Sequence, residues 1–265
     1  PMHLDHPALG ARNASNARGG HAFATGASRP GASRSSAPPP FDSALSAFPL
    51  LELSFERNGF TIRIANGCES LKRQTALLIE RMYSARGLFA YGTRTELDKR
   101  DITVVALQGE RAVATLTVRM DHGSGLLADT LYQKEIDAVR ATGGRVCEIT
   151  QLAIDSGLES HDALAGLLQA LYTLARMTER MTDIFIEVHP RHANFYQRVF
   201  GYRRVGVEKI CPRVGAAAVL LHLSQHDFEH ALARHERTEE RRRCVRRLMP
   251  SKTEVQRLLE RLRRR

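Results

Sequence analysis

The segment DIFIEVHPRHANFYQRVFGY, residues 183–202, decides the fold that this sequence predicts. Residues 184–188 form a short apolar run with β-branched side chains, which is typical of a buried strand. Pro190 cannot continue a strand ladder because it has no N–H group, but it suits the first turn of a helix. Gly201 suits the left-handed residue that ends a helix. The segment therefore predicts a strand, a tight turn, a short helix and a new strand at Tyr202.

Hydrophobic periodicity predicts further elements on both sides of this unit. We expect helices at residues 69–89, 127–142 and 160–180, and strands at residues 60–65, 102–108, 112–121, 146–154, 205–210 and 218–223. The strands on either side of Gly109 form a predicted hairpin. Strands and helices in this order predict a mixed α/β layered sheet with helices against it.

The length of 265 residues predicts one core domain with tails. Residues 1–50 are rich in Ala, Ser, Gly and Pro and have few large apolar residues, so we expect a disordered tail. The core domain is predicted at residues 51–225. Residues 226–265 are predicted to form a basic extension of two helices, broken at Pro250.

The net charge of +10 is concentrated at the ends of the chain. Residues 229–265 carry 13 Lys and Arg against 6 Asp and Glu, whereas the core is close to neutral. We therefore expect no nucleic-acid partner for the core. The basic extension has three interpretations: a solvated helical tail, a docking element for an acidic partner, or an arm that makes weak contact with a membrane surface or nucleic acid.

The cysteines are dispersed, with no spacing that indicates a zinc site or a disulfide framework: they are Cys68, Cys147, Cys211 and Cys244. We therefore predict no metal site and a reducing compartment. The sequence has no signal-peptide pattern and no apolar run of membrane-spanning length, which favours a cytoplasmic protein.

Three ordered motifs resemble one acyltransferase family. They are VCEITQLAID (146–155), FIEVHPRHANFYQRVFGY (185–202) and ICPRVGAAAVLLHL (210–223). A strand and turn followed by FYxxxxGY resembles the GNAT fold, and the full set resembles the bacterial N-acyl amino acid synthases, which are related to acyl-homoserine lactone synthases. The similarity covers residues 55–225. It implies a GNAT-like, mostly antiparallel sheet in which an acyl pantetheine arm slips between two diverging central strands.

Glu148 is the first catalytic candidate. Strict alternation along its strand would place it on one face with Val146, Thr150, Leu152 and Ile154, so its carboxylate would stand among apolar neighbours. Desolvation would then raise its pKa and make it a better base. The resemblance implies the same residue, because related synthases carry a Glu on this strand. The alternative is a glutamate at a sheet edge, paired with an arginine.

Tyr196 is the second catalytic candidate, by resemblance. GNAT enzymes commonly place a tyrosine at this point, where its hydroxyl protonates the leaving sulfur. The alternative is a core residue, because Tyr196 also lies on an aromatic helical stripe with Phe195 and Phe200. Cys147 is not expected to be a nucleophile, since it should point away from the face that carries Glu148.

Polar residues crowd the end of the strand at 184–188, where α/β sheets usually bind ligands. Arg191 could bind the carboxylate of an amino acid through its two-pronged guanidinium. His192 is a further substrate-binding candidate, while Asn194 would either position the substrate or cap the helix. His189 stands where GNAT relatives often have Asn and is more readily a structural histidine.

Two substrate-binding candidates lie elsewhere. Arg86, close to Arg81 and Tyr83, falls in a region that gates the acceptor pocket in the related lactone synthases; the alternative is a solvated basic helix face. Thr150 follows Glu148 on the same strand and completes the predicted set.

The acyl donor is predicted from a difference between this sequence and the CoA-dependent GNAT enzymes. Acetyl-CoA-dependent GNAT enzymes place a glycine-rich loop before a helix to bind the CoA pyrophosphate, and residues 153–168, AIDSGLESHDALAGLL, lack that glycine spacing and the basic residue. We expect no tightly bound cofactor and an acyl-phosphopantetheine co-substrate on acyl carrier protein rather than on CoA.

The sequence thus predicts an N-acyltransferase that moves a medium or long acyl chain from acyl carrier protein to the α-amine of an amino acid. Two other functions stay open: an acyl-CoA-dependent GNAT acting on a small amine, and a non-catalytic module that binds an acyl ligand or a lipid surface.

Overall fold

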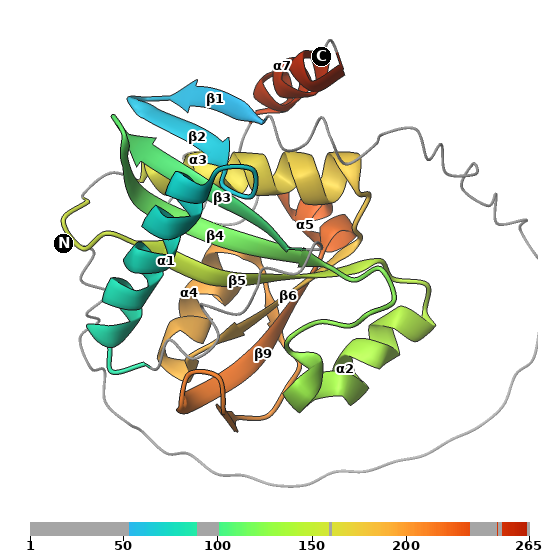
Figure 1. Ribbon diagram of the computed structural model, residues 1–265. Coiled ribbons are helices and arrows are strands. Elements are labelled where there is room, and N and C mark those ends of the chain that lie inside the picture. Colours follow the sequence, from blue (N-terminus) through green and yellow to red (C-terminus); the bar gives the residue numbers. More distant parts are fainter. Residues whose placement is uncertain (1–52, 89–100, 159–160, 234–247, 249–250, 264–265) are drawn as a thin grey trace, which may run out of the picture.

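The computed structural model describes residues 53–88, 101–158, 161–233, 248 and 251–263 (Figure 1). The tail predicted at residues 1–50 lies outside the described residues. No helix in the described part of the chain is long and apolar enough to cross a membrane.

The described strands form one nine-stranded sheet in the order β1-β2-β3-β4-β5-β6-β9-β7, with β8 paired to β9. Their bounds are β1 (Ser54–Arg57), β2 (Phe60–Ile64), β3 (Asp101–Gln108), β4 (Arg111–Met120), β5 (Val146–Ile154), β6 (Asp183–Val188), β7 (Arg203–Arg204), β8 (Lys209–Cys211) and β9 (Ala216–Ser224). The β5–β6 pair is parallel and the other described pairs are antiparallel. The prediction of a mixed, mostly antiparallel sheet is confirmed.

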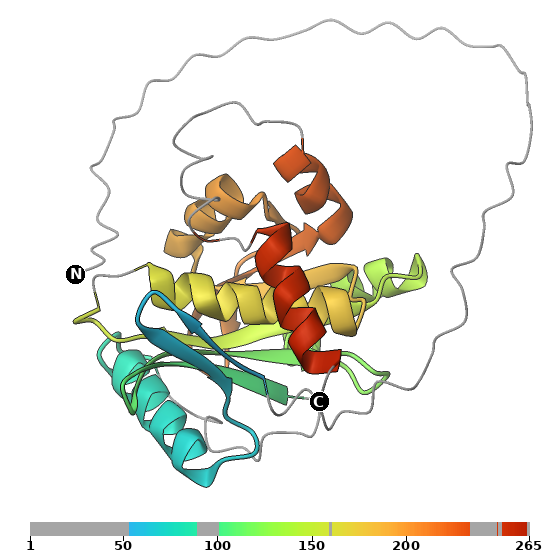
Figure 2. The same ribbon diagram turned by 90° about the horizontal axis from the view of Figure 1, so that it is seen from above.

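Helices cover both faces of the sheet (Figure 2). They are α1 (Glu69–Ser84), α2 (Asp129–Ala141), α3 (Asp162–Leu171), the π-helix η2 (Tyr172–Thr178), α4 (Pro190–Phe200), α5 (Gln225–Ala233) and α7 (Lys252–Arg263). Because side chains alternate along a strand, β3 contributes side chains to the core on both faces of the sheet. Its Val105 packs in the cluster that contains Leu71 of α1, whereas its Val104 packs with Leu167 of α3.

Helix α4 forms as the sequence predicts. His189 caps α4, with Nδ1 accepting a bond from Arg191 N at 3.3 Å, and Pro190 lies in the first turn. Gly201 ends the helix in the left-handed region at φ 82°. Local capping signals therefore predicted both ends of this element.

Three predicted boundaries were wrong. Helix α1 ends at Ser84 rather than near Phe89, and the helix predicted through residue 180 changes from α to π at Tyr172. Of the strand predicted at 205–210, only Lys209 and Ile210 lie in a strand, β8, and the short β7 comes before that range. Gly206 there packs so close to the Tyr132 ring that an added Cβ would come within 2.5 Å of it, a contact that periodicity does not reveal.

Strands β5 and β6 separate partway along their length, and this split positions the site. They pair only from Val146 to Ile149 of β5, although both strands continue beyond that point. Two residues of β5, Gln151 and Leu152, lie opposite the single Leu116 of β4, and Gln151 has φ 54°. This β-bulge bends β5 at the point where it leaves β6.

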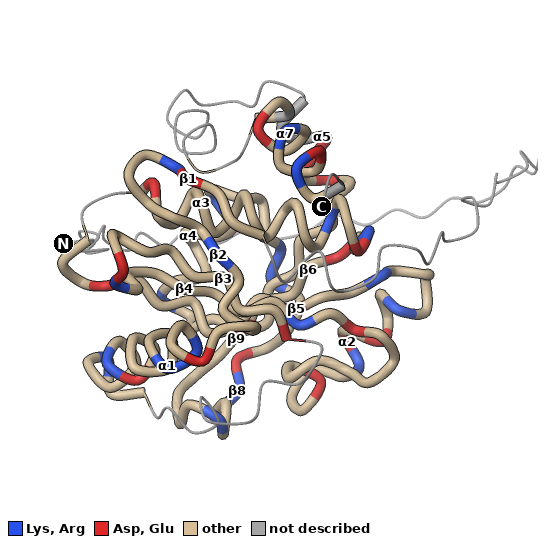
Figure 3. The backbone as a smooth tube through the Cα atoms, turned by 45° about the horizontal axis from the view of Figure 1, so that its top comes forward, with Lys and Arg blue, Asp and Glu red and all other residues tan. Residues whose placement is uncertain are grey.

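The C-terminal helices pack on the core. Phe228 of α5 is buried in the cluster beneath α4, and Leu258 of α7 is buried with Phe55 and Leu174. Glu254 of α7 pairs with Arg57 of β1 at 3.1 Å. Acidic and basic residues are interspersed along α7 (Figure 3). The solvated-tail interpretation therefore does not describe α7, whose apolar face is covered.

Candidate active site

A cavity of about 950 Å³ lies at the split between β5 and β6. Its lining comes from both faces of the sheet, because the separated strands leave a passage between them. On the α1 and α2 side the lining is polar and includes Glu148, Glu187 and Arg213. On the α3, α4 and α5 side it is mainly apolar, with Ile186 and Phe200 among the lining residues. One cavity thus joins a polar chamber to an apolar chamber.

Glu148 lines the polar chamber next to the last β5–β6 pair, Ile149–Ile186, and is only 1 % exposed. Its Oε2 accepts hydrogen bonds from the backbone N–H groups of Leu127, at 2.7 Å, and Ala128, at 3.1 Å. Burial raises the pKa of this carboxyl group, and the charge of Arg213 and the two N–H bonds oppose that rise. The result is a carboxyl group that binds a proton more readily than a solvated glutamate.

The surroundings of Glu148 differ from the prediction in one respect. The bulge at Gln151 inserts an extra residue into β5, so the side chains that follow it point to the opposite faces of the sheet from those expected. Leu152 and Ile154 pack with Ile149 against the clusters beneath α3, and not on the face of Glu148. The edge-strand alternative does not describe Glu148 either, because β5 lies between β4 and β6.

The start of α2 is held in place by a charged network. Arg140 donates to Asp121 Oδ2, at 2.7 Å, and to both carboxylate oxygens of Asp129. Asp129 Oδ2 also accepts from the N–H of Leu126 at 2.6 Å. These bonds fix the backbone next to Leu127, whose N–H contacts Glu148. The network therefore orients the donors that hold the buried carboxylate.

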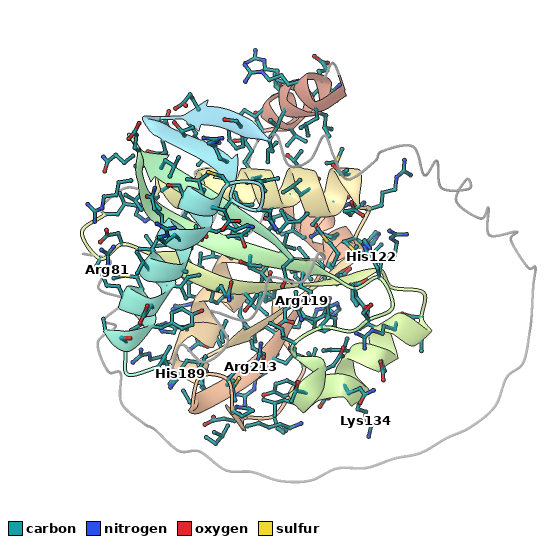
Figure 4. All side chains as sticks on the ribbon, viewed as in Figure 1. Arg81, Arg119, His122, Lys134, His189 and Arg213 are labelled. Atoms are coloured by element: carbon teal, nitrogen blue, oxygen red, sulfur yellow. The ribbon has the colours of Figure 1, made fainter. Side chains whose placement is uncertain are left out.

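Two arginines and two acids complete the polar chamber, and sequence reasoning missed all four. Arg119 makes a bidentate pair with Asp101, with both N···O distances at 2.7 Å. Arg213, from the turn before β9, pairs with Glu187 of β6. Figure 4 shows Arg119 and Arg213 in the region between α1 and α2. Asp101 and Arg119 meet across the β3–β4 hairpin, and Arg213 meets Glu187 only when β6 pairs with β9, so no pattern within one strand marks them.

Arg213 is the cation most closely tied to the candidate base. Its guanidinium is largely buried, with 30 % of the side chain exposed. Burial lowers its pKa, while the nearby charge of Glu148 raises it. The only sequence signal was its place in the motif ICPRVGAAAVLLHL.

Tyr196 lines the cavity and also belongs to an aromatic cluster. Its ring lies 6.0 Å from that of Tyr202 and 5.4 Å from that of Phe195, both edge to face. Burial raises the pKa of its hydroxyl, opposed by the charge of Arg86. The hydroxyl is therefore held in the protonated form that a proton donor needs. The two interpretations of Tyr196 are compatible, because its ring packs while the residue borders the cavity.

Most of the other predicted substrate-binding residues meet at the cavity wall. Arg86, Thr150, Arg191 and His192 all line it, although Arg86 lies in the turn after α1 rather than in the helix. Arg191 Nε donates to His192 Nε2 at 3.1 Å. Burial, then the charges of Arg191 and Arg86, lower the pKa of His192 and favour its neutral form.

Asn194 and Cys147 lie apart from the polar chamber. Asn194 is exposed on α4 and is not among the residues that line the cavity, and the cap of α4 is His189. Cys147 is fully buried in the apolar cluster on the other face, where burial raises the pKa of its thiol. The structure therefore does not bring Asn194 to the site, and Cys147 remains a thiol.

The start of α3 offers little to a pyrophosphate. Asp162 lies in its first turn and accepts from Asn58 Nδ2 at 3.0 Å. Asp155, at the end of β5, pairs with Arg81, at 2.9 Å, and with Arg111. An anion bound here would lie close to the carboxylates of Asp155 and Asp162. The nearby arginines, Arg81 and Arg111, already pair with Asp155.

A mixed sheet that opens between one parallel strand pair, over a cavity bordered by a buried carboxylate, is the architecture of the GNAT acyltransferases. The chain is an N-acyltransferase of this fold. It belongs to the FeeM family of N-acyl amino acid synthases, whose family model matches residues 74–224.

One solved structure supports the fold. FeeM, an N-acyl amino acid synthase from uncultured soil microbes, is 21% identical, with a TM-score of 0.58 over 64% of this chain and 93% of that chain. An acyl-CoA N-acyltransferase from Pseudomonas aeruginosa is 13% identical, with a TM-score of 0.44 over 64% of this chain and 100% of that chain. A comparison with curated proteins gave no match.

Proposed function

We propose that this enzyme transfers a medium or long acyl group from the thioester of acyl carrier protein to the α-amine of an amino acid. The observation that carries the proposal is the position of Glu148, buried in the polar chamber beside the split between β5 and β6. A thioester carbonyl at the split would have the amine on the side of Glu148. Its alkyl chain would lie in the apolar chamber.

The chemistry needs two proton transfers. The neutral amine attacks the carbonyl carbon, forming the C–N bond, and the C–S bond breaks as the tetrahedral intermediate collapses. Glu148, as carboxylate, takes the proton from the amine nitrogen, directly or through one water. Tyr196 gives its proton to the leaving sulfur, and a proton from solvent restores it. The raised pKa of Glu148 suits a base, and burial keeps the Tyr196 hydroxyl protonated before it donates.

An amino-acid acceptor also presents a carboxylate, and two arginines line the cavity in which it would bind. Arg213 borders the polar chamber beside Glu148, whereas Arg191 lies at the exposed rim. We propose that Arg213 is the closer partner of the acceptor carboxylate and that Arg191 acts at the entrance. Arg213→Met should then raise KM for the amino acid at least about tenfold, and Arg191→Met should raise it less. Equal effects would contradict this order.

Acyl carrier protein is the proposed donor because the first turn of α3 carries Asp162 in place of an anion-binding loop. Carrier protein is acidic, so its association with basic surface should weaken as salt increases. The measurement is kcat/KM for acyl carrier protein and CoA thioesters of one chain length at several salt concentrations. Equal or better turnover with CoA would contradict the donor assignment.

The free cysteines Cys68, Cys147 and Cys211 support a reducing, cytoplasmic setting.

Glu148→Gln tests the reaction centre. It keeps the shape and an oxygen for the two N–H bonds but cannot take a proton. We expect kcat to fall at least about 100-fold, and N-acyl amino acids to disappear from extracts of cells that express the variant, as measured by mass spectrometry. Glu80→Gln, on the exposed face of α1, is the matched control and should change neither. An unchanged kcat would remove Glu148 from the mechanism.

A further inference from the structure

The apolar chamber continues well past the split. Val188 of β6 pairs with Val219 at the open end, and Asp183 pairs with Ser224 at the other end of the strand. The five-residue offset corresponds to about 16 Å along β6. Ile184, Ile186 and Val188 line the cavity along this path, and so does Phe228 of α5. The chamber therefore extends from the reaction centre to the start of α5.

The far end of this apolar path is polar. Gln225, the residue after Ser224, lines the cavity and is only 4 % exposed. Its backbone is fixed, since Gln225 N donates to Thr182 O at 2.8 Å. Its side-chain Oε1 is buried and has no hydrogen-bond partner among the described residues. A buried carbonyl oxygen without a donor is costly, so this position favours a ligand that supplies one.

The π-helix η2 contributes Tyr172 and Arg176 to the lining of the same cavity. Both side chains donate to Glu229 Oε1 of α5, Tyr172 Oη at 3.4 Å and Arg176 Nε at 2.9 Å. These contacts join η2 to α5 at the end of the chamber. π-Helical turns are rare and occur often at functional sites. The irregular helix and the unpartnered amide are independent features of one location.

We propose that this far end is a binding subsite for a hydroxyl group carried on the distal part of the acyl chain. This inference rests on the proposed function, because it places the acyl chain in the apolar chamber. A hydroxyl would donate to Gln225 Oε1, whereas a plain hydrocarbon would bury the amide without a partner. The preferred substrates are then hydroxylated acyl thioesters of the length that reaches Gln225.

Direct binding tests the subsite separately from catalysis. Purified full-length protein is loaded with a fluorescent fatty acid, which is displaced by straight-chain fatty acids and by their ω-hydroxylated counterparts of equal length. For the length that reaches Gln225, the hydroxylated acid should bind about fivefold tighter than the plain acid. Gln225→Leu should abolish or reverse that preference, since it replaces the amide by an apolar group of similar size.

Gln169→Leu is the matched control. Gln169 is also a buried glutamine, 5 % exposed, but it bonds Arg57 and does not line the cavity. Its variant should keep the hydroxyl preference. Gln225→Leu should fold, because it removes a buried polar group without a partner, and thermal unfolding of both variants verifies this.

The outcomes separate the subsite from the proposed function. Plain and hydroxylated acids that bind equally at every length, or a preference that survives Gln225→Leu, would overturn the subsite and leave the acyltransferase proposal intact. If no fatty acid displaces the probe while acyl transfer still occurs, the acyl chain lies elsewhere and the subsite is wrong. If neither binding nor transfer is seen, the proposed function fails together with the subsite.

Discussion

At the scale of single residues, the site depends on groups whose proton affinity is set by burial. Glu148 is surrounded by protein on both faces of β5, and its ionised form is supported by two N–H groups and by nearby arginines. Burial still dominates, so its pKa is raised. A group tuned as a base in this way should reduce the stability of the fold in its ionised form.

That cost gives a prediction about stability and pH. A carboxyl group whose pKa is higher in the folded state keeps its proton longer there, so stability falls as pH rises from the ordinary glutamate pKa, about 4.3, through the raised value. Glu148→Gln has no such titration. We expect its free energy of unfolding to exceed that of the wild type increasingly over this window and then by a constant amount. Urea unfolding at a series of pH values measures the difference, and a difference independent of pH would contradict the raised pKa.

Tyr196 provides a second prediction at this scale. Tyr196→Phe keeps the ring that packs on Phe195 and Tyr202 but removes the proton donor. We expect kcat to fall about 100-fold with little change in KM or in thermal stability. Tyr202→Phe, in the same aromatic cluster, is the control and should keep most of the activity. Steady-state kinetics of both variants decides whether Tyr196 acts as a proton donor or only as a packing residue.

At the scale of elements, the segment that leads into α2, Leu127 and Ala128, matters as much as the strand that carries Glu148. Its N–H groups are positioned by the bonds of Arg140 to Asp121 and Asp129, and they offset part of the desolvation of the carboxylate. Arg140 does not touch the cavity, so it acts through the backbone.

Arg140→Met should loosen this turn and weaken the two N–H bonds to Glu148. The acid limb of the kcat/KM profile, set by ionisation of Glu148, should then move up by as much as about one pH unit. A structural defect alone would lower activity at all pH values and leave the limb in place. Arg140→Lys, which keeps the charge, should restore part of the shift, and the pH–rate profiles of both variants are the measurement.

At the scale of the whole molecule, the C-terminal helix α7 is part of the core, although it lies far along the chain from β1, on which it packs. Leu258 is 4 % exposed and packs with residues of β1 and α3. Helix α7 therefore closes the side of the molecule where the chain begins its first described strand (Figures 1 and 2).

Leu258→Ala should lower the free energy of unfolding by about 2 to 4 kcal/mol, because it removes buried methyl groups and leaves a cavity. Leu77→Ala, at a position 59 % exposed on α1, should change it by less than about 0.5 kcal/mol. Chemical unfolding of the two variants measures both values. If Leu258→Ala cost no more than Leu77→Ala, α7 would not be docked in solution.

Much of this protein could be predicted from its sequence because the signals are local. Pro190 and Gly201 bound α4, periodicity placed most helices and strands, and three motifs indicated the family before any fold was known. Glu148 and Tyr196 stood out within those motifs, and both line the cavity.

Only the tertiary structure decided the rest, since it depends on residues that meet across long distances in sequence. The bulge at Gln151 turned the side chain of Leu152 to the opposite face of the sheet and bent β5 at the split. No residue type in the sequence marks the position of an extra residue in a pair of strands. Arg213 reached Glu187 only when β6 and β9 aligned. Electrostatics and packing of this kind arise from the three-dimensional arrangement, so composition and periodicity could name the strand that carries the base but not the groups that tune it.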